Sequence, residues 1–120
     1  MNVFIPNAIR VSDELRKEGG TAKFKWTTGS WLIHEYLRTR SREEAEALTE
    51  AIRRNDICWH GLPFTTHTEL MSGRLFEYGL SLSNELDKKF GRTTVAAKMT
   101  DVPGHTKGLV PALAAAGIRY

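Results

Sequence analysis

The sequence predicts an α/β fold with a parallel sheet, and more narrowly a part of a parallel β/α barrel. Helix-like and strand-like segments alternate along the whole chain, as expected for parallel strands joined by right-handed helical crossovers. A closed barrel takes about 200 residues or more. This chain has 120 residues, begins on a helix and stops inside a strand. We therefore expect one partial domain over residues 1–120, with about three strand-helix units and the start of another strand.

The first half of the chain reads helix, strand, helix, strand. Residues 7–18 carry apolar side chains on one helical face, and two glycines follow as a stop. Residues 22–32 alternate in the manner of a strand that ends in a loop at Gly29. Residues 41–55 begin with a capping box and keep an apolar face, which predicts a helix. The apolar run at 57–61 predicts a short buried strand.

The second half repeats the alternation. The longest helix is predicted over residues 72–90, with an apolar stripe that includes Leu75 and with Gly91 as its stop. Residues 93–100 then predict a third strand, and "DVPGHT" forms its exit loop. The stretch "GLVPALAAAG" predicts a last helix, in which Pro111 is tolerated only in the first turn. The final "IRY" predicts the start of a fourth strand.

Composition narrows the functional classes. The content is 41% hydrophobic and 26% charged, which is typical of a soluble globular domain. The basic run at 38–42 is followed by two glutamates and has no interleaved aromatic residues, so it predicts a solvated helix entry and no nucleic-acid partner. Cys58 is the only cysteine and lies in an apolar run, which favours a buried thiol. Neither a leader nor a membrane-length apolar run is recognisable, so we expect a cytoplasmic protein that contacts no membrane.

Polar side chains gather where the predicted parallel strands end, which is the usual ligand-binding edge in this architecture. Asp101 follows the third strand, and a carboxylate there could bind a metal, act as a nucleophile, or form a turn before Pro103. His105 could bind a metal or a substrate hydroxyl, or could fix its own loop. For Asp101 and for His105, a role in a functional site and a role in holding the loop both stay open.

The loop after the second strand is the other candidate. His60, His67 and Glu69 could contact a substrate, although their spacing is no established metal motif and the neighbouring threonines could pin the loop to its own backbone. Trp31 and Phe64 offer flat apolar faces on which sugar rings could stack. We expect the remaining candidates to be structural: Trp59 in the core, and His34 and Glu35 packed in a short helix.

Three stretches follow one another in the order of a known enzyme family. "WHGLPFTTHTEL" stands where that family has a Gly-Gly-Trp loop leading to Asp-Glu, "SGRLFEYGLSLSNELDKKFG" where it has a long helix, and "TDVPGHT" where it has Asp-Pro-Phe-Gly-His-Ser. Residues 55–120 thus resemble the N-terminal catalytic barrel of glycoside hydrolase family 38, the α-mannosidases, in the wider glycoside hydrolase/deacetylase barrel group. With "WTTGSWL" included, nearly the whole chain is similar to a bacterial subgroup with a family 38 N-terminal-like domain of undefined activity.

The resemblance implies a zinc-dependent retaining glycoside hydrolase that acts on carbohydrate. It places Asp101 on the residue that is both zinc ligand and nucleophile, His105 on the histidine of the same motif, and Glu69 on the glutamate of the Asp-Glu pair. The loop tryptophan is replaced by Phe64 and the aspartate by Thr68, which bears on mannose specificity. The family's other zinc ligands have no counterpart in this chain, so we expect it to be inactive alone. A metal-dependent carbohydrate deacetylase and a non-catalytic carbohydrate-binding or structural module are the alternatives.

Overall fold

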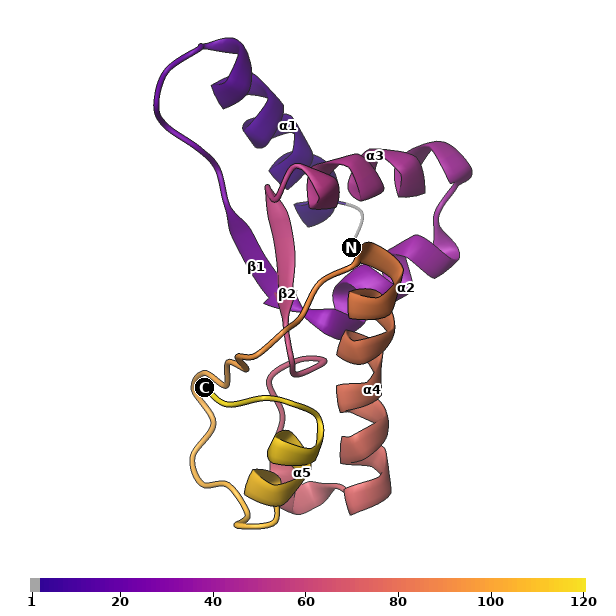
Figure 1. Ribbon diagram of the computed structural model, residues 1–120, viewed down its shortest axis with the longest axis vertical. Helices are drawn as coiled ribbons and strands as arrows, with labels where there is room; N and C mark the ends of the chain where they lie inside the picture. Colours follow the sequence, from indigo (N-terminus) through magenta and orange to yellow (C-terminus); the bar gives the residue numbers. More distant parts are fainter. Residues whose placement is uncertain (1–2) are drawn as a thin grey trace.

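The computed structural model describes residues 3–120, which form five α-helices, one short 3-10 helix and two strands. The molecule is elongated, with extents of 46 × 30 × 26 Å (Figure 1). Helices α1 and α3 lie at one end of the long axis, and α5 with the first half of α4 lies at the other. In chain order the elements are α1 Phe4–Lys17, β1 Trp26–Gly29, α2 Ser30–Thr39, α3 Arg42–Arg53, β2 Ile57–His60, the 3-10 helix Thr68–Leu70, α4 Gly73–Phe90 and α5 Leu109–Ala115.

The two strands pair in parallel, as the sequence predicts, and the pairing sets where their loops emerge. Trp26 lies opposite Ile57 at one end of the ladder, and Gly29 lies opposite His60 at the other. Helices α2 and α3 form the crossover between the strands. Because parallel strands end on the same side, the start of α2 after Gly29 and the loop after His60 leave the sheet at the same edge.

The prediction of a partial β/α barrel is wrong for residues 3–120. The two short strands form the whole regular sheet of this part of the chain, and residues 93–100 and 118–120 are extended without joining it as strands. The physical reason is an irregular ladder. Gly61 donates its amide to Ala96 at 2.9 Å, but the carbonyl of Val95 accepts from both Arg119 (2.7 Å) and Tyr120 (3.2 Å). Two amides on one carbonyl break the alternation that a strand requires.

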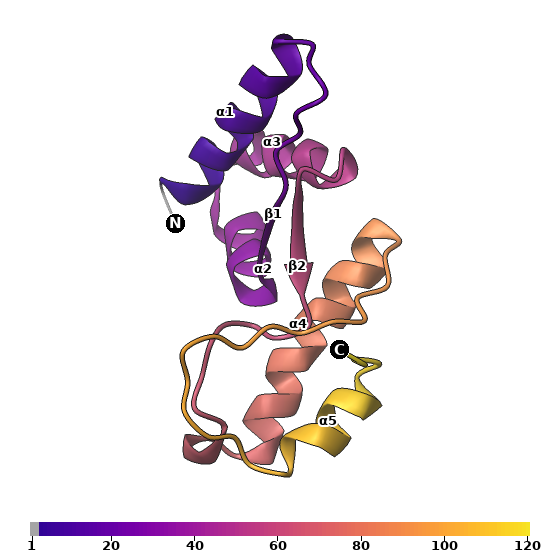
Figure 2. The same ribbon diagram turned by 90° about the vertical axis from the view of Figure 1, so that its left-hand side faces the viewer.

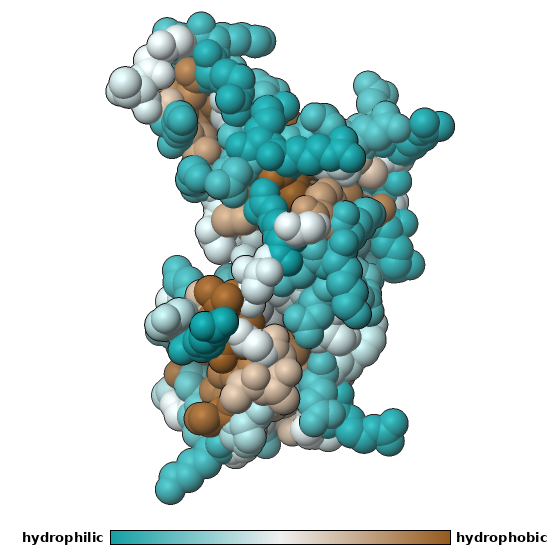
Figure 3. Space-filling view, viewed as in Figure 1, coloured by the Kyte–Doolittle hydropathy of each residue, from teal (hydrophilic) through white to brown (hydrophobic). Residues whose placement is uncertain are grey.

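Apolar side chains form two separate clusters, one at each end of the molecule. The first lies where α1, α2 and α3 cover the sheet, and it includes Tyr36, Leu48 and Trp59. The second joins Leu62 to the first half of α4 and to the inner side of α5 (Figure 2). On the face seen in Figure 3, hydrophobic residues reach the surface mainly near α5 and the C-terminus. Helix α4 runs from one cluster to the other, since Phe76 belongs to the second and Leu86 to the first.

Helix boundaries follow local signals closely. Ser41 caps α3 and forms the predicted capping box with Glu44. Ser72 accepts the amide of Leu75 at the start of α4, and Gly91 ends this helix in the left-handed conformation, at φ 64°. Pro111 falls in the first turn of α5, where its missing N–H costs nothing. Trp59 is buried as predicted, and its indole N–H donates to Asp87 at 3.0 Å.

Candidate functional site

The loop after β2 folds back over the start of α2. The amide of Ser30 donates to the carbonyl of Leu62 at 3.0 Å, and the amide of Trp31 donates to that of Pro63 at 3.2 Å. The first amides of a helix have no partner within it, so the loop carbonyls take the place of a capping side chain, which Gly29 cannot supply. This contact fixes Trp31 and Phe64 next to each other.

Two glycines make room for this loop. A Cβ atom on Gly29 would lie 2.1 Å from the carbonyl oxygen of Pro63, and one on Gly79 would lie 2.8 Å from the ring of the same proline. Pro63 is buried and therefore wedged between the end of β1 and the middle of α4. Neither position tolerates even a methyl group without a shift of the loop.

An apolar depression of about 180 Å³ lies beyond Pro63. The rings of Trp31 and Phe64 meet edge to face, with centroids 6.1 Å apart and planes at 85°. Both side chains are partly exposed, at 39% and 47%. Helix α4 contributes Leu75 and Tyr78 to the opposite side, and both are also exposed.

A larger depression of about 440 Å³, lined by both polar and apolar residues, adjoins the apolar one. Met71 and Phe76 line both, so together the two depressions form one surface feature, which we call the strand-end groove. Two glutamates, Glu69 and Glu77, line the larger depression. Hydroxyl groups are also present there, from Thr68, Ser72 and Thr106.

Thr68 ties the two candidate loops together beside the groove. Its hydroxyl oxygen accepts the amide of Thr106 at 3.1 Å and lies 3.4 Å from Nδ1 of His105. Thr68 is buried, whereas His105 is exposed. The structure thus brings His105 next to Thr68, which directly precedes Glu69, although 37 positions separate Thr68 from His105.

His60 occupies the end of β2 and is half-buried. Its Nδ1 accepts the amide of Leu62 at 3.3 Å, so this nitrogen carries no proton and the ring is neutral with its proton on Nε2. Burial lowers the pKa of His60, and the positive charge of Lys98 lowers it further. His60 therefore holds the turn that places Leu62 and Pro63 on α2, and it does not line the groove.

Asp101 and His67 are not brought into the groove. Asp101 is exposed in a left-handed backbone conformation, at φ 59°, and within residues 3–120 no hydrogen bond or ion pair holds its carboxylate. His67 is exposed at the start of the 3-10 helix, where its carbonyl accepts the amide of Leu70. Of the predicted site residues, Trp31, Phe64 and Glu69 line the groove, and His105 contacts its wall through Thr68.

Other candidates have structural partners. His34 lies 3.6 Å from Glu85 on α4, and Glu35 pairs with Arg38 at 2.8 Å within α2, as expected for packing residues. Leu75 was expected on the buried stripe of its helix, but it is 55% exposed, and Phe76 is buried in its place. Tyr78, which the sequence analysis did not name, lies three residues after Leu75 on the same side of α4. This spacing of three residues is the feature of the sequence that places Tyr78 beside Leu75.

The structure shows no zinc site within residues 3–120. In the part of the chain that the structure describes, no three histidine, cysteine, aspartate or glutamate side chains are grouped so that they could hold a metal. The resemblance assigns only one zinc ligand, Asp101, to this chain, and a protein zinc site needs three or four. None of the helices in residues 3–120 is both long and apolar enough to cross a membrane.

Comparison with protein family models, with curated proteins and with solved structures finds no match to this chain.

Proposed function

We propose that the strand-end groove binds carbohydrate. The observation that carries this proposal is the junction of two surfaces at Met71 and Phe76: an aromatic wall from Trp31 and Phe64 on one side, and carboxylates with hydroxyls on the other. Sugars need both kinds of surface, because one face of the ring exposes C–H groups and the rim exposes hydroxyls.

The geometry suits a neutral polar ligand. The T-shaped contact leaves part of each ring uncovered, so the apolar C–H face of a sugar can lie against Trp31 or Phe64. Carboxylates such as Glu69 and Glu77 are acceptors for two hydroxyl hydrogens each, and within residues 3–120 neither of them forms an ion pair. The larger depression of the groove, which contains both glutamates, measures about 440 Å³ and is within the range of about 300 to 1,000 Å³ usual for small-ligand sites.

A titration with mannose-containing oligosaccharides, followed by calorimetry or amide shifts, tests the proposal. We expect Phe64→Ala to weaken binding about tenfold, because it removes the aromatic partner of Trp31. The matched control is Phe4→Ala, since Phe4 is also exposed but lies on α1, remote from the groove. Equal affinity of Phe64→Ala and the native chain, or an equal loss in Phe4→Ala, would refute carbohydrate binding at this place.

A second candidate function is a segment of a glycoside hydrolase related to family 38. It is favoured by the contact of Thr68 with His105, which joins the two loops that carry the family-like motifs. Here Asp101 would supply one carboxylate of a retaining mechanism, and the second carboxylate, about 5 to 5.5 Å away, would come from residues outside 1–120. A fluorinated glycosyl inhibitor that labels Asp101 in an active, longer protein supports this function, and labelling of another residue rejects it.

A further inference from the structure

Another depression, of about 380 Å³, lies at the opposite end of the sheet, before β1 and β2 begin. It lies between the end of α1, the segment that leads into β1, and the turn between α3 and β2. Four cationic residues and one carboxylate line it: Arg16, Lys23, Lys25, Arg54 and Asp56. This is a strong local excess of positive charge for a chain whose formal net charge is only +3.

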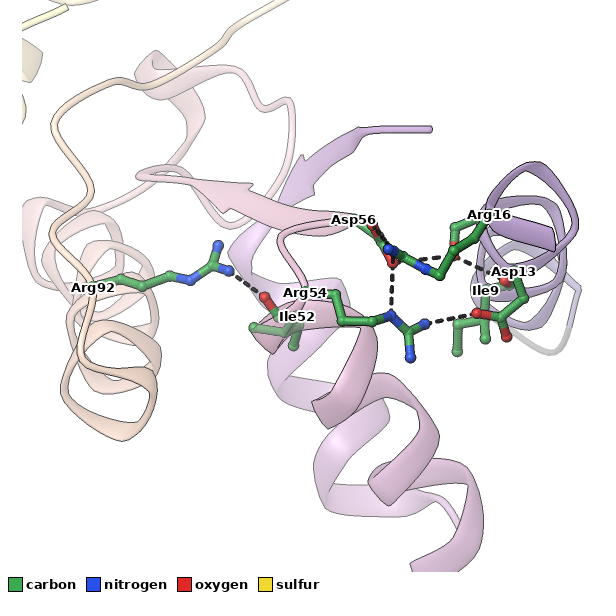
Figure 4. A network of polar contacts seen from close by, with 8 residues as sticks. Ile9, Asp13, Arg16, Ile52, Arg54, Asp56 and Arg92 are labelled. Atoms are coloured by element: carbon green, nitrogen blue, oxygen red, sulfur yellow. Dashed lines mark hydrogen bonds and ion pairs between the residues drawn. The ribbon is translucent and has the colours of Figure 1, made fainter. Parts of the chain in front are cut away.

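Asp56 organises the two arginines. Arg16 donates to both of its carboxylate oxygens at 2.8 Å, and Arg54 donates through Nε at 3.0 Å (Figure 4). The hydroxyl of Ser12 contacts the same carboxylate at 3.3 Å. Burial raises the pKa of Asp56, but the hydrogen bonds and the positive charges of Arg54 and Arg16 together lower it by more, so the pKa of this carboxyl lies below its usual value. Arg54 is also bound by Asp13 at 2.9 Å, so Asp56 and Asp13 together offset the charge of both arginines.

Lys23 and Lys25 keep their charge unopposed. They flank Phe24, which packs on the core of α1, α2 and α3, and all three residues line the depression. Both lysines are exposed. No carboxylate in residues 3–120 forms an ion pair with either lysine. The lining of the depression therefore includes two lysines without an ion-pair partner, beside the Asp56 carboxylate that both arginines bind.

The backbone adds donors at the same place. No amide of residues 20–25 donates to a backbone carbonyl within residues 3–120, although Gly20, Ala22, Lys23 and Lys25 all line the depression. Free amides and ammonium groups together are the donors that bind phosphate in proteins. A neutral sugar would leave the ammonium charges unused, and a nucleic acid would favour an extended surface with exposed aromatic residues instead of a depression.

We propose that this depression binds the phosphoryl group of a small, soluble phosphorylated ligand, with Lys23 and Lys25 as its charged contacts and the free amides of residues 20–25 as its hydrogen-bond donors. The site is separate from the strand-end groove, because it lies at the other end of both strands and shares no lining residue with it. The inference does not depend on the carbohydrate proposal.

The test is a titration of the ¹⁵N-labelled chain with glucose 6-phosphate, with glucose as the neutral control. We expect amide shifts in residues 19–25 and 54–56 with the phosphate ester and none there with glucose. The double variant Lys23→Gln/Lys25→Gln should lose about tenfold or more in affinity, since each charge-assisted contact is a strong one. The matched control is Lys88→Gln/Lys89→Gln, which removes two exposed lysines at the end of α4 and should bind as the native chain does.

Three results would overturn the proposal. The first is an unchanged affinity in Lys23→Gln/Lys25→Gln, provided that its thermal unfolding matches that of the native chain. The second is a set of shifts spread over lysines throughout the molecule, which indicates unspecific ion binding. A third arm uses vesicles that contain phosphatidic acid: binding to these vesicles that is tighter than binding to glucose 6-phosphate would assign the site to a lipid headgroup and reject a soluble ligand.

Discussion

The ring of Trp31 stands at 85° to the ring of Phe64, with 6.1 Å between their centroids. The two residues are far apart in the chain, and they meet because the carbonyls of Leu62 and Pro63 accept the first two amides of α2. The aromatic wall of the groove therefore depends on backbone contacts at the start of a helix. Changes that disturb those contacts should act on the groove even where they do not touch a ligand.

Gly29→Ala should open the loop. The new methyl group would collide with the carbonyl of Pro63, so the variant should lose about 1 to 3 kcal/mol of unfolding free energy in urea. Gly73→Ala is the control, because nothing lies within 4 Å of that position and α4 already begins there. A Gly29→Ala variant as stable as the native chain would show that Pro63 does not press on the end of β1.

Thr68→Val should release the loop of residues 101–106. It keeps the shape of the side chain but removes the oxygen that accepts the amide of Thr106, at a cost of about 1 to 2 kcal/mol. Hydrogen exchange at the Thr106 amide should become faster. Thr65→Val, at an exposed position in the same loop, should leave that exchange rate unchanged. Equal exchange in both variants would contradict the role of Thr68.

Stability should decrease as the pH falls below about 6.5. The pKa of His60 is lower in the folded chain than in the unfolded chain, so the unfolded chain takes up the proton first. The stabilisation that His60 contributes is complete above the pKa that its side chain has in the unfolded chain. It is lost as the pH falls toward the lower pKa that the side chain has in the folded chain. His60→Gln retains an acceptor for the Leu62 amide but does not titrate, so its unfolding free energy should vary less between pH 5 and 7. An identical pH dependence in both proteins would exclude His60 as the source.

Local signals in the sequence predicted the helices well. The capping box of Ser41 and Glu44, the cap at Ser72 and the left-handed Gly91 are all set by residues within one turn of a helix end. The prediction of a strand at 93–100 was wrong, because a strand depends on partners elsewhere in the chain. Its hydrogen-bond partners are Gly61, Arg119 and Tyr120, and these make too irregular a ladder.

The candidate site was predicted in part. The aromatic pair of Trp31 and Phe64 was found because each follows the end of a strand, and parallel strands bring their ends together. Leu75 was assigned to the buried stripe and Tyr78 was not named, because the exposed side of α4 is decided by where Pro63 and α5 pack. Their spacing of three residues places them on one side of the helix but does not say that this side is exposed. Asp101 lies outside the groove, and the last backbone hydrogen bond before it in its segment is the one from Ala97 to Tyr120.

The most direct test of the carbohydrate groove is the indole N–H signal of Trp31 in a titration with oligosaccharides, assigned by comparison with Trp31→Phe. Trp26 and Trp59 supply internal references, because both pack in the core cluster of the sheet. We predict a saturable shift of the Trp31 signal that is absent in Phe64→Ala, with the other two indole signals unchanged. A Trp31 signal that does not move at saturating oligosaccharide, or that moves together with those of Trp26 and Trp59, would contradict a carbohydrate site in this groove.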